Sequence, residues 1–442
     1  MTARLSVLLL FLAVGAGCDR AGIEPLQPQL TIESPDLSEI LAGPELTLRV
    51  RAAGSGRIAS LRIGERLATR SGDSFSATLN VTRGLNAIPL VALDADGEQV
   101  LADTAYALFI NPVTELQTPP TGLEGGGGLS LTSLDVDRLL MAGGEPPAGD
   151  AKAPATLLRA SGELLFVENE AELLTARYNH SATLLPDGSV LLLGGATRRV
   201  PRSPDEFVAT AEIITPGRST SERVLFLGDG TPPRRSGHVT RLVEADGEIL
   251  LFLVGGLVPG TPPSPSQTVD VLRYVPGGVP RLAVLTPPGG AGDLPELPDP
   301  VLLDLTSSPD GNALSLLYGL GPSDDVASRL TWMPPGPPSY PVGLSTSEAP
   351  GLLGGRTRAA SAALPGGLFL VSGGQDDAGA TLASVEAVAP AAGQSFTLPT
   401  AGSLIRPRSG HAATSLGPGR MIVIGGYNEA GFPILEPEII TL

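Results

Sequence analysis

Three histidines are the first residues in this sequence that could do chemistry. Each follows an arginine by three positions, giving the pairs Arg177 and His180, Arg235 and His238, and Arg408 and His411. Histidine is a preferred ligand of zinc, so three of them invite a metal hypothesis. All three occupy one position of a repeated pattern, however, and we therefore favour a structural position over a metal site.

Four acidic residues recur in the same manner. Each lies in a strand-like segment that follows a pair of glycines; they are Glu212, Asp270, Glu386 and Glu438. Two carboxylates could serve as general acid and base, but their repetition favours pairing with the repeat arginines or with backbone amides. No Gly-x-Ser-x-Gly, phosphate-loop, Cys-x-x-Cys or His-Glu-x-x-His motif occurs. We therefore expect a protein that is not an enzyme and has no cofactor and no metal.

A repeated unit positions these residues. In Ala176–Gly195 a strand, a turn at Pro186-Asp187-Gly188, an apolar strand and a glycine pair follow one another. About six copies of this unit occupy the chain from residue 129 onward, with turn and pair at nearly constant spacing and long loops between copies. The glycine pairs are Gly143-Gly144, Gly194-Gly195, Gly255-Gly256, a degenerate Gly319-Leu320-Gly321, Gly373-Gly374 and Gly425-Gly426.

The order of these features resembles the kelch repeat of galactose-oxidase-like proteins: R-x-x-H, a hairpin, Gly-Gly, and then a strand that carries an acid. The resemblance covers residues 113–442 and implies four-stranded blades in a six-bladed propeller. In the fifth copy we align Arg358 and Ser361 with the arginine and the histidine. Whether the degenerate fourth copy forms a full blade stays open.

The last copy ends one strand short of a blade. Val113–Pro119 precedes the first copy and is expected to supply that strand, which would close the ring. Copper chemistry in galactose oxidase relatives needs a cysteine that is cross-linked to a tyrosine. Because Cys18 is the only cysteine and lies outside the repeats, the resemblance implies no such cofactor.

The first residues are typical of an exported lipoprotein. Residues 1–17 combine Arg4, an apolar core and small residues before Cys18, which resembles a bacterial lipobox. We expect lipidation of Cys18, a tether over 18–28, and an envelope location in the periplasm or at the cell surface, with the membrane contacted only through the lipid anchor. Ordinary cleavage, with Cys18 incidental, is the competing interpretation.

Residues 29–112 alternate between polar and apolar positions in short segments separated by turns, which predicts a small β-sandwich. The run from Gly84 to Gly97 resembles the late hairpin of bacterial immunoglobulin-like domains. Such a domain would act as a spacer. The predicted fold class is therefore all-β: a six-bladed kelch-type propeller preceded by a small immunoglobulin-like sandwich.

The net charge of −17 excludes a nucleic-acid partner. Loops after the glycine pairs and before each copy should share one face, which would carry many arginines. Guanidinium groups bind carboxylates well, although salt bridges between blades are the competing use for most repeat arginines. The candidate ligand-binding residues are Arg198, Arg199, Arg202, Arg234, Arg356 and Arg406.

We expect this loop face to bind a protein or an acidic glycan at the cell surface. A carbohydrate-active enzyme of the lyase or epimerase type, working at the centre of the propeller, is the alternative. A purely structural surface protein is the third possibility.

Overall fold

The computed structural model describes residues 28–442 with several internal gaps. The gaps are 54–57, 121–125, 145–153, 162–163, 199–200, 228–231, 246, 287–300, 308–313, 320–325, 334–342, 351–354 and 390–393. For residues 301–350 only the backbone of the strands is described. Cys18 and Arg199 lie outside the described residues.

The chain divides into two compact units. The smaller comprises residues up to Pro35, Thr47–Leu79 and Pro89–Thr104; the larger comprises Asp36–Leu46, Asn80–Ile88 and Ala105–Leu442. Parts of the predicted sandwich segment, 29–112, therefore belong with the larger unit. Within that unit Leu108 and Ile110 are buried in one apolar cluster with Phe396.

Two four-stranded sheets form from residues 29–109. One has the order β1-β2-β6-β5 and the other β4-β3-β7-β8. The strands are β1 (Gln29–Ser34), β2 (Glu45–Ala53), β3 (Ser60–Ile63), β4 (Arg66–Leu67), β5 (Thr69–Ser71), β6 (Ser74–Asn80), β7 (Gly84–Leu93) and β8 (Gln99–Phe109). In β2 alternate residues are buried, as expected for a strand with one face on a core and one face in solvent.

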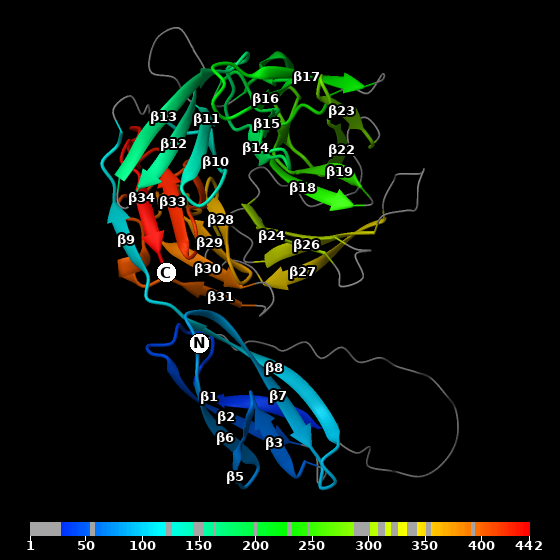
Figure 1. Cartoon of the computed structure of the whole chain (residues 1–442), viewed down its shortest axis with the longest axis vertical. Coiled ribbons are helices and arrows are strands. Elements are labelled where there is room, and N and C mark those ends of the chain that lie inside the picture. Colours follow the sequence, from blue (N-terminus) through cyan, green and yellow to red (C-terminus); the bar gives the residue numbers. More distant parts are fainter. Residues whose placement is uncertain are drawn as a thin grey trace. The chain divides into compact units, whose positions relative to one another are not determined.

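Six four-stranded blades follow, and Figure 1 shows them arranged in a ring. Blade one consists of β10 (Leu129–Ser133), β11 (Arg138–Gly143), β12 (Pro154–Ser161) and β13 (Leu164–Glu172). Blade two consists of β14 (Ser181–Leu184), β15 (Val190–Leu193), β16 (Ala211–Ile214) and β17 (Glu222–Leu227). Blade three consists of β18 (Val239–Ala245), β19 (Glu248–Val254), β22 (Val269–Val275) and β23 (Arg281–Val284). Blade four consists of β24 (Val301–Ser307), β25 (Leu314–Gly319), β26 (Val326–Met333) and β27 (Gly343–Pro350). Blade five consists of β28 (Ala360–Leu364), β29 (Leu368–Ser372), β30 (Val385–Ala389) and β31 (Gln394–Thr397). Blade six consists of β32 (Ala412–Ser415), β33 (Arg420–Ile424), β34 (Glu438–Thr441) and β9 (Val113–Leu116). The degenerate fourth copy thus forms four antiparallel strands.

The ring closes in the way that the sequence predicts. Strand β9 pairs antiparallel with β34, from Glu438 opposite Leu116 to Thr441 opposite Val113. The last blade therefore takes its outermost strand from the chain that precedes the first blade. This pairing covers a strand edge at each end of the array.

Blades two and three share an additional connection that the repeat does not predict. Their outermost strands, β17 and β23, pair in parallel, with Leu225 opposite Arg281. The two blades thus form one eight-stranded sheet. Blades one and two are joined more briefly, by a parallel bridge between Glu172 at the end of β13 and Thr220, which precedes β17.

The second strand of each described blade is apolar along its length because it is covered on both faces. All residues of β15 and β29 are buried, and the clusters they join contain residues of two neighbouring blades. Such strands appear as continuous apolar runs rather than alternating ones. The ring is thus held together by apolar layers between blades, and its innermost strands are left to line the centre.

Helical structure is confined to short 3-10 turns in the described part of the chain, namely η1 (Pro204–Glu206) and η3 (Thr400–Gly402). The third blade carries a small extra hairpin, β20 (Leu257–Val258) with β21 (Ser264–Pro265), in the loop after its glycine pair. Among the described residues, no helix is long and apolar enough to cross a membrane.

Candidate functional site

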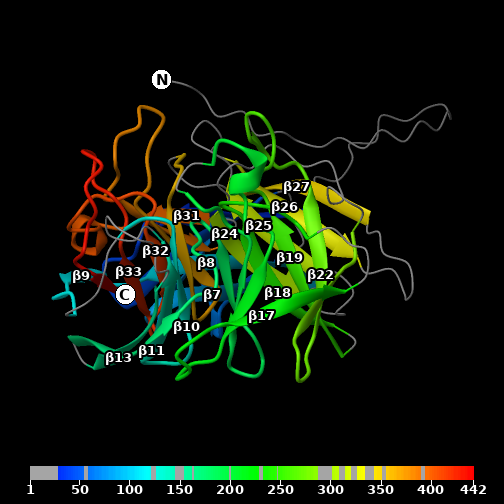
Figure 2. The same cartoon turned by 90° about the horizontal axis from the view of Figure 1, so that it is seen from above.

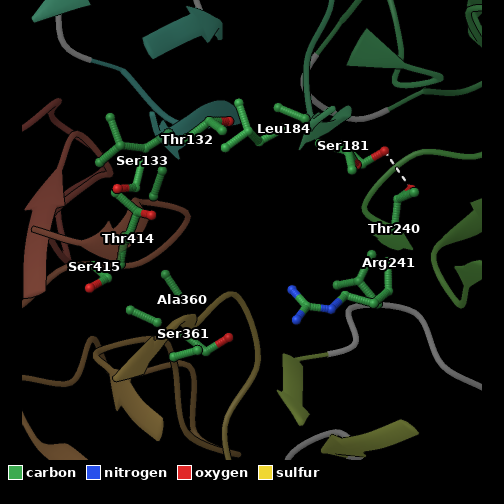
Figure 3. Close-up of a pocket in the computed structure, with 18 of the residues that line it drawn as sticks. Thr132, Ser133, Ser181, Leu184, Thr240, Arg241, Ala360, Ser361, Thr414 and Ser415 are labelled. Carbon is green, nitrogen blue, oxygen red and sulfur yellow. Dashed lines mark hydrogen bonds between the residues drawn. The ribbon is translucent and has the colours of Figure 1, made fainter. Parts of the chain in front are cut away.

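The centre of the ring holds a cavity of about 640 Å³. Its walls come from the innermost strands β10, β14, β18, β28 and β32, which surround the opening in Figure 3. These strands have their neighbours on one side only, so their side chains at the ring centre are accessible. Figure 2 shows the same ring from another direction.

Hydroxyl groups dominate the polar part of this wall. The serines and threonines that line it are Thr132, Ser133, Ser181, Thr183, Thr240, Ser361, Thr414 and Ser415. The hydroxyl of Thr132 is buried and has no hydrogen-bond partner. A buried hydroxyl without a partner costs free energy. Because a hydroxyl both donates and accepts, this wall is suited to a polyhydroxylated ligand.

Arg241 adds a positive charge to the wall. It follows the histidine position of its repeat by three residues, and the equivalent residues in three other blades are Thr132, Thr183 and Thr414. In Figure 3 its guanidinium extends toward the middle of the opening. Arg241 also interacts with another part of the protein, but a guanidinium has five N–H donors and can serve several partners. Among the described residues, no other ionisable side chain except the buried histidines lines the cavity.

The sequence analysis does not single out Arg241. The signal was present, because an arginine stands where the other copies have threonine. A repeat pattern that is defined by the residues shared between copies does not contain such a replacement.

The three histidines are enclosed between neighbouring blades. In each case Nε2 lies close to the hydroxyl of a serine in the preceding blade: 2.9 Å from Ser130 for His180, 3.0 Å from Ser181 for His238, and 2.9 Å from Ser372 for His411. Burial lowers the pKa of His238 and His411 to about 3 and that of His180 well below its ordinary value. The rings are therefore neutral at pH 7.

In three blades the first glycine of the pair makes room for the histidine of the next blade. A Cβ atom on Gly194 would lie 2.8 Å from Cε1 of His238, and one on Gly373 would lie 2.8 Å from Cε1 of His411. Both glycines also have positive φ angles, 63° and 55°, which other residues rarely adopt. Within the described residues, no three acidic, cysteine or histidine side chains gather so that they could hold a metal ion.

The repeat arginines are buried in ion pairs with the recurring acids. The pairs are Arg177 with Glu212, Arg235 with Asp270, Arg356 with Glu386, and Arg408 with Glu438. Each guanidinium also donates to the carbonyl of the first glycine in its own blade, for example Arg408 to Gly425 at 3.0 Å. The arginine thus ties the start of the blade to its second and third strands. This is the structural role that the repetition favours.

Arg356 is a correction to the predicted ligand-binding set. It is 3% exposed and paired with Glu386, so it cannot reach a ligand on the loop face. The alignment of the fifth copy is also wrong by two residues, because Arg356, and not Arg358, fills the repeat position. Ala359, and not Ser361, then stands in place of the histidine, where it lies against Gly374.

The other described arginines of the predicted set lie at the surface. Arg198 is paired with Glu206 at 2.9 Å, and the backbone amide of Arg202 donates to the same carboxylate at 2.5 Å. These contacts lower the pKa of the Glu206 carboxyl, and the hydrogen bond from the Arg202 amide makes the largest contribution. Arg406 is paired with Glu436 at 3.1 Å. Arg202 and Arg234 are exposed.

The comparisons with known proteins identify no family. No family model matches the chain, and no curated protein matches it. Among solved structures, that of YjhT has 12% sequence identity, covers 74% of this chain and 97% of its own, and gives a TM-score of 0.48. A fungal alcohol oxidase of the AA5 family, in complex with copper, has 13% identity, covers 94% of this chain and 74% of its own, and gives a TM-score of 0.41.

The strand order of this chain shows a propeller of six four-stranded blades. The expectation that this chain is not an enzyme is corrected, because it rested only on motifs that are missing from the sequence. Missing motifs of unrelated folds were a poor reason to exclude catalysis, since sites on a propeller are built from several blades.

Proposed function

We propose that this protein acts on a carbohydrate at the centre of the propeller, and that the preferred sugar carries a carboxylate. The observation that supports this proposal is the cavity wall, where serine and threonine hydroxyls from several blades surround the guanidinium of Arg241. Hydroxyls match the alternating donors and acceptors of a sugar ring, and arginine binds a carboxylate through paired N–H donors.

The central cavity suits this role better than the loop face. Of the predicted arginines, Arg356 is buried, and both Arg198 and Arg406 are paired with acids. The cavity of about 640 Å³ is in the size range of small-molecule sites. In this proposal the described residues of the cavity bind and orient the sugar. The reaction class that we propose to test is the lyase or epimerase type.

The test is a screen of acidic saccharides, each beside its neutral counterpart, with NMR detection of both binding and new products. We expect the acidic member to bind, and Arg241→Ala to weaken its affinity about tenfold or more, which corresponds to the loss of a charge-assisted hydrogen bond. Arg202→Ala is the matched control on the loop face and should leave affinity unchanged. The proposal is wrong if Arg202→Ala, and not Arg241→Ala, weakens binding.

We further propose that the chain is held to a membrane through lipid on Cys18, as the small residues before this cysteine suggest. A partner at the cell surface, either protein or acidic glycan, would then meet the propeller outside the cytoplasm. Cys18→Ala should release the protein into the soluble fraction. Retention in the membrane fraction would refute the anchor.

A further inference from the structure

In each of the three histidine–serine pairs the ring Nε2 lies close to the serine hydroxyl, but the next partner of that hydroxyl differs between the pairs. The hydroxyl of Ser130 reaches the carbonyl of Ala142 at 3.4 Å, and that of Ser372 reaches the carbonyl of Ala360 at 3.4 Å. Ser181 instead lies 2.6 Å from the hydroxyl of Thr240. Two chains of hydrogen bonds therefore end on backbone, whereas the third ends on a side chain that lines the cavity.

The direction of the third chain depends on which nitrogen of His238 carries the proton. Nδ1 of His238 has no hydrogen-bond partner. The carbonyl of Arg235 lies near the ring and raises its pKa, but Nδ1 and this carbonyl do not meet both the distance and the angle of a hydrogen bond. Buried N–H groups without an acceptor are rarer than buried acceptors without a donor. The neutral ring should therefore carry its proton on Nε2.

That tautomer sets every later bond in the chain. Nε2–H of His238 donates to Ser181 Oγ over 3.0 Å, and the Ser181 hydroxyl donates to Thr240 Oγ1 over 2.6 Å. Thr240 then has no need to donate back to Ser181. Its own hydrogen is left to point elsewhere, and Figure 3 shows Thr240 between Ser181 and Arg241 at the edge of the opening.

We propose that His238 and Ser181 are positioning residues that make the Thr240 hydroxyl a hydrogen-bond donor toward the central cavity. The proposal deepens the proposed function and rests on it for the location of the ligand. Thr240 and Arg241, which are neighbours in β18, would then both present donors to the cavity. The ligand group that Thr240 recognises is an oxygen acceptor, such as a carboxylate or carbonyl oxygen, and not a sugar hydroxyl that must donate.

The tautomer can be measured without any ligand. In protein labelled with ¹⁵N at histidine, two-bond correlation spectra distinguish a protonated Nε2 from a protonated Nδ1. The three rings are assigned with Ser130→Ala, Ser181→Ala and Ser372→Ala, each of which should shift the signals of one histidine. We expect His238 to be protonated at Nε2. Protonation at Nδ1 overturns the proposal, because the chain would then run in the opposite direction.

Binding provides the second measurement, with sodium glucuronate as the probe. Ser181→Ala should weaken its affinity about fivefold, the loss expected for one oriented hydrogen bond. Ser130→Ala is the matched control, because it removes an equivalent serine from an equivalent histidine but leaves the cavity wall intact. Equal affinities in the two variants would overturn the proposal.

Substitution of Thr240 separates orientation from packing. Thr240→Val removes the hydroxyl and should weaken glucuronate binding about as much as Ser181→Ala does, whereas Thr240→Ser keeps the hydroxyl and should bind like the wild type. If the serine variant binds no better than the valine variant, the donor role is wrong. If the wild type binds no acidic saccharide, the proposed function fails, while the tautomer of His238 still decides the proposal on the hydrogen-bond chain.

Discussion

The spaces between blades and the wall of the central cavity are made by the same repeat, yet they use it differently. Between blades, an arginine pairs with an acid four times over, and a histidine meets a serine three times over. On the wall, the residue three positions after the histidine position of the repeat is threonine in blades one, two and six but arginine in blade three. Agreement between copies marks residues that hold the ring together, and disagreement marks candidates for function.

The largest effect should come from breaking one buried ion pair. Arg177→Met keeps most of the side-chain volume but leaves Glu212 buried without its cation, which should cost about 3–5 kcal/mol of unfolding free energy. Urea denaturation measures the loss. In the control, Arg177→Met combined with Glu212→Leu should recover most of it. If the single variant is as stable as the wild type, these pairs are not what holds the blades.

Mild acid should destabilise the ring through its histidines. The pKa of His238 and of His411 is about 3 in the folded protein and about 6.5 when unfolded. As the pH falls below 6.5 the unfolded chain binds protons that the folded chain does not, so stability is full above pH 6.5 and declines toward pH 3. Each histidine should contribute about 1.4 kcal/mol per pH unit in this range.

Denaturation at pH 7.5, 6.5 and 5.5 checks this prediction. His411→Asn should reduce the slope between pH 6.5 and 5.5 by the share of one histidine. A stability that does not change over this interval would mean that the rings take up protons in the folded state, which contradicts their burial.

The smallest effect should come from the cavity wall. Thr414→Ala removes a half-buried hydroxyl that lines the opening and should change unfolding free energy by less than about 0.5 kcal/mol. The same variant should weaken binding of an acidic saccharide about threefold. Calorimetry gives the affinity and urea denaturation the stability. A large stability loss with unchanged affinity would place Thr414 with the scaffold instead.

The propeller itself could be predicted because each copy carries local signals. The turn at Asp187-Gly188 and the pair Gly194-Gly195 are set by backbone conformations that glycine adopts easily, and both glycines of the pair have positive φ angles. The strand that closes the ring could also be predicted, because the last copy lacks its fourth strand and an unpaired strand segment precedes the first.

Other features depend on contacts that the sequence pattern does not contain. Arg356 and Arg358 are two residues apart, and only the position of Glu386 decides which of them is buried. The parallel pairing of β17 with β23 joins two blades through residues with no repeat signal. Arg241 replaces a threonine of other copies, which the sequence shows, but only its place on the cavity wall makes it a candidate for binding.

The strand that closes the ring also sets an order in time. During synthesis β9 leaves the ribosome before any blade, whereas its partner β34 follows the first five blades in the chain. Every blade between them can form by local hairpins while the ring is still open, because their strands follow one another closely in the chain. Closure must wait for β34, so a chain interrupted before this strand would keep an open circle with two unpaired edges. Synthesis of β34 is therefore itself a condition for a sealed propeller.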